Sequence, residues 1–104
     1  METGNSKYMK FNREISIDIC ILNHRNPRRI TNLKDIKAIM IANYSNVYIK
    51  YGLWNPKANY SFLRPKWYVV EDQSLDFFRF KDLYLKRFEH DQIASGYILI
   101  RIYE

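Results

Sequence analysis

Alternating apolar and polar positions predict four β-strands along the chain. The clearest strand covers residues 14–22, in which every second residue is isoleucine, as in a strand with one buried face. Residues 97–103 show the same alternation. Shorter runs of β-branched and aromatic residues predict strands at 47–54, ending near Gly52, and at 66–70.

A first helix is expected after a turn at residues 23–30. Thr31 or Asn32 can cap its first turn by accepting hydrogen bonds from the main chain. Apolar residues then recur at helical spacing at Leu33, Ile36, Ile39 and Met40.

A second helix is expected at about 75–93, between the polar residues 71–74 and Gly96. Residues 71–74 offer capping oxygens and negative charge, which stabilise the positive end of a helix. The pattern of residues 75–80 also fits a strand, so the start of this helix stays open. Its apolar residues at helical spacing are Phe77, Phe80, Tyr84 and Phe88.

The element order is strand, helix, strand, strand, helix, strand. This order predicts an α+β fold with ferredoxin-like βαββαβ topology, an antiparallel sheet with two helices packed on one face. We expect residues 1–10 to form a flexible N-terminal arm and residues 11–104 a single domain. A chain of 104 residues with 47% apolar residues buries one core without disulfides or metals.

Composition narrows the protein class. No run approaches the roughly 20 apolar residues that span a bilayer, and residues 1–7 lack the apolar core of a secretion signal. We therefore expect a cytoplasmic protein. The single cysteine, Cys20, falls in a strand-like run and is expected to be a buried thiol, not a nucleophile.

Positive charge is concentrated in the first two thirds of the chain. The net charge is +6, but residues 1–70 hold 12 Lys and Arg against 4 Asp and Glu, a net charge of +8. Such a surface attracts polyanions or acidic proteins. Many Asn, Ile, Lys and Tyr with few Gly and Pro are typical of AT-rich coding DNA, which favours a phage or mobile-element origin.

A first candidate binding segment follows the first strand and continues onto the predicted helix. Guanidinium groups bind phosphate or carboxylate oxygens in a bidentate manner, so clustered arginines suit nucleic acid or an acidic protein surface. A merely solvated basic loop is the alternative. The residues are Arg25, Arg28, Arg29, Lys34 and Lys37.

A second candidate segment is a loop at residues 54–68, in which aromatic and basic residues interleave. Aromatic rings stack on unpaired bases while cations hold phosphates, and the same residue types favour protein interfaces. Alternatively, Trp54, Phe62 and Trp67 pack the loop onto the domain. The candidate residues are Trp54, Lys57, Tyr60, Arg64, Lys66 and Trp67.

The open face of the predicted sheet is a third candidate. The first strand would neighbour the last, so that Asp18 lies near Tyr97, Arg101 and Tyr103. Two tyrosines beside an arginine can form a stacking platform for bases. The alternative is an ion pair between Asp18 and Arg101, with the tyrosines covering the sheet or packing in a dimer.

The sequence carries no recognisable catalytic motif. It has two histidines far apart, no glycine-rich phosphate loop and no His/Cys spacing suited to zinc. We expect a non-enzymatic protein without a cofactor or metal. A nuclease that binds a divalent ion at Asp18, with His24 as a base, is a third hypothesis.

These observations order the functional hypotheses. The leading one is a small basic protein, from a phage or mobile element, that binds nucleic acid or a nucleoprotein through basic and aromatic loops. The alternative is a protein inhibitor of a host defence nuclease, comparable in role to an anti-CRISPR protein, that acts by protein–protein binding. The chain is expected to be a monomer or a homodimer, since exposed strand edges can pair.

Overall fold

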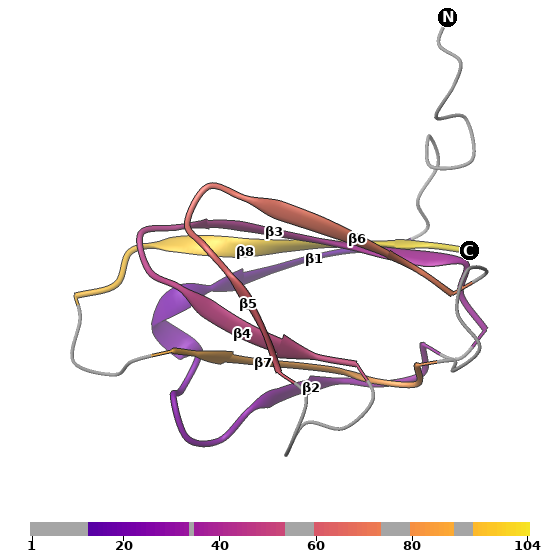
Figure 1. The fold of residues 1–104 in the computed structure, drawn as a ribbon, viewed down its shortest axis with the longest axis horizontal. Helices are drawn as coiled ribbons and strands as arrows, with labels where there is room; N and C mark the ends of the chain where they lie inside the picture. Colours follow the sequence, from indigo (N-terminus) through magenta and orange to yellow (C-terminus); the bar gives the residue numbers. More distant parts are fainter. Residues whose placement is uncertain (1–12, 34, 54–59, 74–79, 89–92) are drawn as a thin grey trace, which may run out of the picture.

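Two antiparallel β-sheets stack face to face in the computed structural model (Figure 1). The structure describes residues 13–33, 35–53, 60–73, 80–88 and 93–104. The predicted arm at residues 1–10 and the candidate residues Lys34, Trp54 and Lys57 lie outside the described residues.

The first sheet, here called the β3–β8 sheet, contains the two longest strands. Its order is β1-β8-β3-β6, with every neighbouring pair antiparallel. The strands are β1 (Arg13–Asp18), β8 (Gly96–Tyr103), β3 (Ala38–Ser45) and β6 (Tyr68–Asp72). A 3₁₀ helix, η2 (Ile19–Ile21), follows β1, and the Asp18 side chain accepts a hydrogen bond from the Cys20 N–H at its start.

The second sheet, here called the β4–β7 sheet, is built from shorter strands in the order β2-β7-β4-β5. The strands are β2 (Arg28–Ile30), β7 (Leu83–Arg87), β4 (Ile49–Gly52) and β5 (Ser61–Leu63). β5 and β6 are edge strands of the two different sheets, joined by the turn at residues 64–67.

The core lies between the two sheets, where branched aliphatic side chains from both inner faces meet. The β3–β8 sheet contributes alternate residues, so the isoleucine patterns of β1 and β8 both face inward. Fully buried members include Ile39, Ile41, Ile98, Ile100 and Ile102 from one sheet and Ile49, Leu83 and Leu85 from the other.

A buried polar side chain, Asn43, ties the sheets together at one end. Its amide nitrogen donates to the main-chain oxygens of Val47 at 2.9 Å and Leu63 at 3.0 Å, and its side-chain oxygen accepts from the Ser45 N–H at 3.0 Å. Since buried polar groups are costly without partners, this network fixes how β3 meets the β4–β5 hairpin.

The β5–β6 connection is a tight turn followed by a β-bulge. The Trp67 N–H donates to the Arg64 oxygen, with Pro65 and Lys66 at the two central positions and Lys66 at φ 71°. Proline followed by a residue of positive φ is the arrangement of a type II turn. Lys66 and Trp67 then both pair with Asn43, through Lys66 N–H and Trp67 C=O, which makes a bulge at the start of β6.

The predicted ferredoxin-like α+β fold is wrong. The first predicted helix is replaced by the central strand β3, and the described part of the second contains the strand β7. All four predicted strands overlap strands of the structure, although β1 ends at Asp18 and β6 extends to Asp72. The fold is therefore a β-sandwich, with no layer of helices among the described residues.

Cys20 is exposed, which corrects the prediction of a buried thiol. The strand ends before it, and in the 3₁₀ turn its Sγ lies 3.5 Å from the Ala94 oxygen. A hydrogen bond with Asp18, and then the charge of that carboxylate, raise the pKa of the Cys20 thiol. The thiol form of Cys20 is therefore favoured over the thiolate.

Candidate functional site

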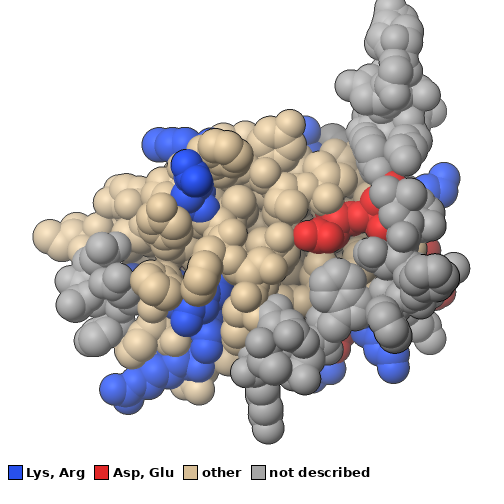
Figure 2. Space-filling view, in the orientation of Figure 1, with Lys and Arg blue, Asp and Glu red and all other residues tan. Residues whose placement is uncertain are grey.

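The outer face of the β4–β7 sheet gathers cations and aromatic rings from four strands. Cross-strand pairing places Arg29 opposite Tyr84, and Lys50 opposite both Lys86 and Phe62. Their neighbours along each strand, such as Leu83, Leu85 and Tyr51, are buried, so these residues point away from the core. In Figure 2, blue side chains cross the lower left of the molecule, over β4 and β7.

We call this surface the basic aromatic face. It comprises the outward-pointing residues of β2, β4, β5 and β7, together with three residues that lie one position outside these strands and continue their alternation. Its members are Arg29, Tyr48, Lys50, Tyr60, Phe62, Tyr84, Lys86 and Phe88.

Lys50 lies at the centre of an aromatic cluster on this face. Its ammonium nitrogen lies 4.9 Å from the Phe88 ring centroid and 5.7 Å from that of Phe62. The two rings meet edge to face with centroids 5.1 Å apart, and the Tyr48 ring lies 6.5 Å from that of Phe88. Tyr48, Phe62 and Phe88 are 49%, 62% and 42% exposed, so their rings remain open to a ligand.

Lys86 forms a second cation–aromatic pair beside the first. Its ammonium nitrogen lies 4.5 Å from the ring centroid of Tyr60. Gly52 of β4, opposite Tyr84, carries no side chain on this face. Neither Lys50 nor Lys86 forms an ion pair with a carboxylate of the described residues. Two ammonium groups with no carboxylate partner in the described part of the chain therefore lie opposite each other on adjacent strands.

Arg29 lies at the edge of the basic aromatic face, on the edge strand β2. Its guanidinium donates to the Asp82 carboxylate from Nε at 3.2 Å and Nη2 at 2.8 Å, and its Cζ lies 5.8 Å from the Tyr84 ring centroid. The hydrogen bond to Asp82 raises the pKa of Arg29. Because Asp82 already compensates this charge, Arg29 contributes less positive potential than the two lysines.

The predicted residues of the first basic segment separate in the structure. Arg29 lies on the basic aromatic face, whereas Arg28 is opposite Leu85 on the other side of β2 and is exposed at the edge of the sheet. Arg25 lies in the loop before β2, where its Nε donates to His24 Nε2 at 3.3 Å. Lys37 lies at the far end of the β3–β8 sheet, where its N–H donates to the Tyr103 oxygen. The segment is therefore not one surface.

The predicted aromatic segment is also divided. Tyr60 belongs to the basic aromatic face, while Arg64, Lys66 and Trp67 form the β5–β6 turn. The Arg64 guanidinium carbon lies 4.5 Å from the Trp67 ring centroid. Phe62 and Trp67 are 62% and 56% exposed, so packing of the loop onto the domain does not account for these two rings.

The most central members of the face were not predicted as site residues. Lys50 and Lys86 lie outside the two predicted basic segments, and Tyr84 and Phe88 were assigned to a helix. The available signal was the alternation of Leu83 and Leu85 with Tyr84 and Lys86, which fits a strand with one polar, aromatic face.

The first and last strands do lie side by side, as predicted, but with different partners. Asp18 is opposite Tyr97, and Arg101 is opposite Glu14. The predicted ion pair between Asp18 and Arg101 is therefore wrong: Arg101 Nε donates to Glu14 Oε2 at 2.7 Å, and Asp18 caps the 3₁₀ helix. On the same outer face Tyr97 packs against Tyr44, with ring centroids 5.3 Å apart.

Within the described ranges, no group of three His, Cys, Asp or Glu side chains is placed to hold a metal ion. The same residues form no helix long and apolar enough to cross a membrane. Comparisons with protein-family models, curated proteins and solved structures give no match.

Proposed function

We propose that the protein binds single-stranded nucleic acid on the basic aromatic face, without catalysing a reaction. The observation that carries this proposal is the Lys50 ammonium in contact with both the Phe62 and the Phe88 rings, with Lys86 opposite Lys50 on the next strand. Exposed rings stack on unpaired bases of any sequence, while neighbouring cations hold the phosphate backbone. The cytoplasm is the proposed location.

Unpaired strands fit this surface better than duplexes. Edge-to-face and tilted rings on a sheet present π-surfaces, and bases reach such surfaces only when they are unstacked from a helix. Burial and then the neighbouring Tyr84 raise the pKa of Tyr60, so its ring stays neutral at physiological pH. A neutral ring accepts both a base and the Lys86 ammonium without repelling phosphate.

Fluorescence anisotropy with labelled single- and double-stranded DNA and RNA, at low and moderate salt, tests the proposal. We expect salt-sensitive binding of single strands that is lost in Lys50→Glu/Lys86→Glu. The matched control is Arg13→Glu/Lys37→Glu, which changes the net charge equally but lies on the β3–β8 sheet and at its end. Equal losses in the two double variants, or no binding of the parent chain at low salt, would contradict the proposal.

A second candidate is binding to a host protein, such as a defence nuclease. It is supported by three tyrosines on the outer face of the β3–β8 sheet: Tyr44, Tyr68 and Tyr97 are 45%, 66% and 43% exposed. Tyrosine is enriched in protein interfaces. Co-purification of one host protein after nuclease treatment, lost in Tyr44→Ala/Tyr97→Ala, favours this function over nucleic-acid binding.

A further inference from the structure

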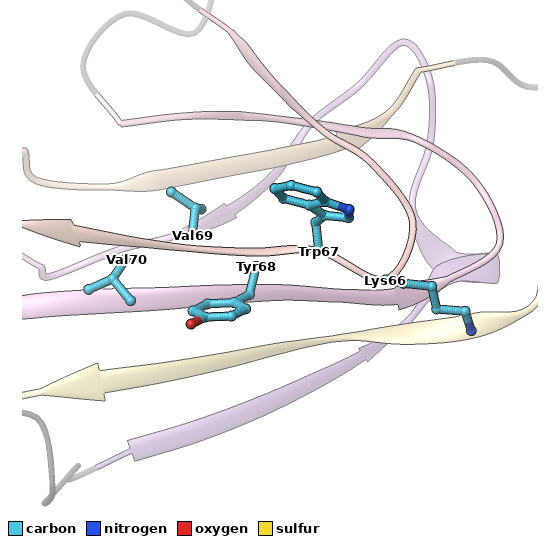
Figure 3. Close-up of a pocket in the computed structure, with 5 residues that line it drawn as sticks. All are labelled: Lys66, Trp67, Tyr68, Val69 and Val70. Carbon is cyan, nitrogen blue, oxygen red and sulfur yellow. The ribbon is translucent and has the colours of Figure 1, made fainter.

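The edge of β6 that faces away from β3 is a second candidate binding surface. Among the described strands, β6 pairs with β3 alone. A groove of about 520 Å³ runs along this edge, lined by Lys66, Trp67, Tyr68, Val69 and Val70 (Figure 3). An exposed strand edge presents unpaired N–H and C=O groups, which are a template for another strand.

The direction of the free backbone groups follows from the pairing with β3. Trp67 C=O accepts from the Asn43 N–H at 2.8 Å, and Gln73 N–H donates to the Lys37 oxygen at 2.9 Å. Backbone groups of alternate residues point to opposite sides of a strand, so odd-numbered residues of β6 bond to β3. The N–H and C=O groups of Tyr68 and Val70 therefore point away from β3, towards the edge of the sheet.

The charges along β6 are complementary to those of a second β6 strand that runs in the opposite direction. From residue 66 to residue 72 it begins with a lysine, continues through aromatic and β-branched residues, and ends with Glu71 and Asp72. Figure 2 shows blue side chains near the β5–β6 turn and red ones near the other end of β6, with uncharged surface between them. A second copy turned by a two-fold rotation meets opposite charges at both ends.

We propose that two copies of the chain associate through antiparallel pairing of their β6 strands, with Val69 on the two-fold axis. In this register Tyr68 faces the second copy's Val70, and Lys66 faces the second copy's Asp72. Tyr68 and Val70 then form hydrogen-bonded pairs with each other's counterparts, which matches the direction of their backbone groups. Lys66, whose N–H is bonded to Asn43 in the bulge, contributes only its side chain to the contact. The two β3–β8 sheets become one continuous sheet.

Side-chain packing favours the same register. Tyr68 and Val70 point to one side of β6, and Trp67 and Val69 to the other (Figure 3). Tyr68 and Val70 are 66% and 39% exposed, and the pairing covers them with each other as cross-strand aromatic and β-branched neighbours. Closed two-fold pairing also removes the free edge, which otherwise promotes open-ended aggregation.

A charge-exchange experiment tests this register. Sedimentation velocity on the parent chain is expected to show a concentration-dependent dimer. Lys66→Glu and Asp72→Lys should each raise the dimer dissociation constant by about tenfold or more, because like charges then face each other at both ends. An equimolar mixture of the two variants should recover the parent affinity, because its heterodimer restores both opposite-charge pairs. A monomeric parent chain, or no recovery in the mixture, overturns the proposal.

A cross-linking measurement keeps the test independent of charge, since Asp72 also interacts within its own chain. In a Cys20→Ser background, Val69→Cys is expected to form an intermolecular disulfide, because directly opposed residues of a non-hydrogen-bonded pair lie close enough. Val70→Cys is the matched control, since Val70 does not face itself in this register. Equal cross-linking of both, or of neither, overturns it. The basic aromatic face takes no part in this contact, so either proposal can fail without the other.

Discussion

The side-chain amide of Asn43 donates a 3.0 Å hydrogen bond to the main-chain oxygen of Leu63 and so joins the two sheets of the sandwich. A second bond from the same nitrogen reaches the Val47 oxygen, and Asn43 is fully buried. Replacing Asn43 removes the side-chain donor of the Leu63 oxygen and the side-chain acceptor of the Ser45 N–H, whereas the Val47 oxygen keeps the Ser45 hydroxyl at 3.0 Å. A buried polar group that loses its partner costs its full desolvation penalty.

We expect Asn43→Ala to lower the free energy of unfolding by roughly 2–4 kcal/mol, because the Leu63 oxygen loses its side-chain donor and the Ser45 N–H loses its side-chain acceptor in a buried site. Urea denaturation followed by circular dichroism measures this loss. The control is Asn26→Ala, at an exposed asparagine of the loop before β2. A similar stability for the two variants would show that the Asn43 network does not hold the sheets together.

Gly96 is fixed by its close approach to β3. A Cβ atom there would lie 2.3 Å from the Tyr44 oxygen, and the residue has a φ of 104°, a region that side chains disfavour. Gly96→Ala is expected to cost about 2 kcal/mol or more. Thermal unfolding compared with Ser95→Ala, the neighbouring exposed position, measures the effect. A melting temperature equal to that of the control is incompatible with this contact.

Lys66 occupies a backbone conformation that favours glycine, at φ 71° in the β5–β6 turn. Lys66→Gly and Lys66→Ala both remove the charge and the long side chain, so their difference isolates the backbone. We expect the glycine variant to be more stable by about 1 kcal/mol, the reverse of their usual order in a strand. Urea denaturation at low protein concentration compares them, and a more stable alanine variant would refute the strain.

The strands with one buried face were predictable, but the central strand β3 was not. Residues 38–43 of β3 are buried or nearly so on both faces, so the apolar run shows no alternation and its spacing also fits a helix. For the same reason the residues of β7 were predicted to form a helix. Phe80, Tyr84 and Phe88 lie four residues apart, and a spacing of four fits both the helical period of 3.6 and the strand period of 2.

The candidate site was predictable only in part, for a related reason. Its chemistry, cations beside exposed rings, was expected from the basic and aromatic content. Its members, such as Arg29, Lys50, Phe62 and Lys86, lie on four strands, and only the strand order brings them onto one face. A local window of sequence holds no information about that pairing, which is why clustered residues such as Arg28 were favoured over isolated ones.

Tyr51 makes folding sensitive to alkaline pH. Its hydroxyl donates to the Glu71 carboxylate at 3.0 Å, and burial, followed by the charge of Glu71, raises the pKa of Tyr51 to about 12. A pKa above the unfolded value of about 10 means that the neutral phenol is favoured in the folded state. Its contribution to stability is full below pH 10 and is lost as the pH rises towards 12.

We therefore expect the parent chain to lose more stability than Tyr51→Phe between about pH 10 and pH 12, because phenylalanine has no proton to release. The difference between the two urea denaturation midpoints, followed across this range, removes the titration of the other tyrosines. Tyr68→Phe is the control, at an exposed tyrosine. A constant difference between the parent chain and Tyr51→Phe would show that Tyr51 is not linked to folding.

Charge and stacking make separable contributions to the proposed nucleic-acid binding. Lys50→Ala or Lys86→Ala should weaken binding and also reduce the slope of log affinity against log salt by roughly 0.7, since each ammonium releases one counterion from a single strand. Phe62→Ala should weaken binding by about 1–3 kcal/mol with the slope unchanged, because loss of a ring does not change the number of counterions released.

Trp67→Ala, at an exposed ring on the turn outside the basic aromatic face, is the control. Anisotropy titrations over a salt series distinguish these effects. A change of slope in Phe62→Ala, or an affinity loss in Trp67→Ala equal to that in Phe62→Ala, would place the binding surface elsewhere on the molecule.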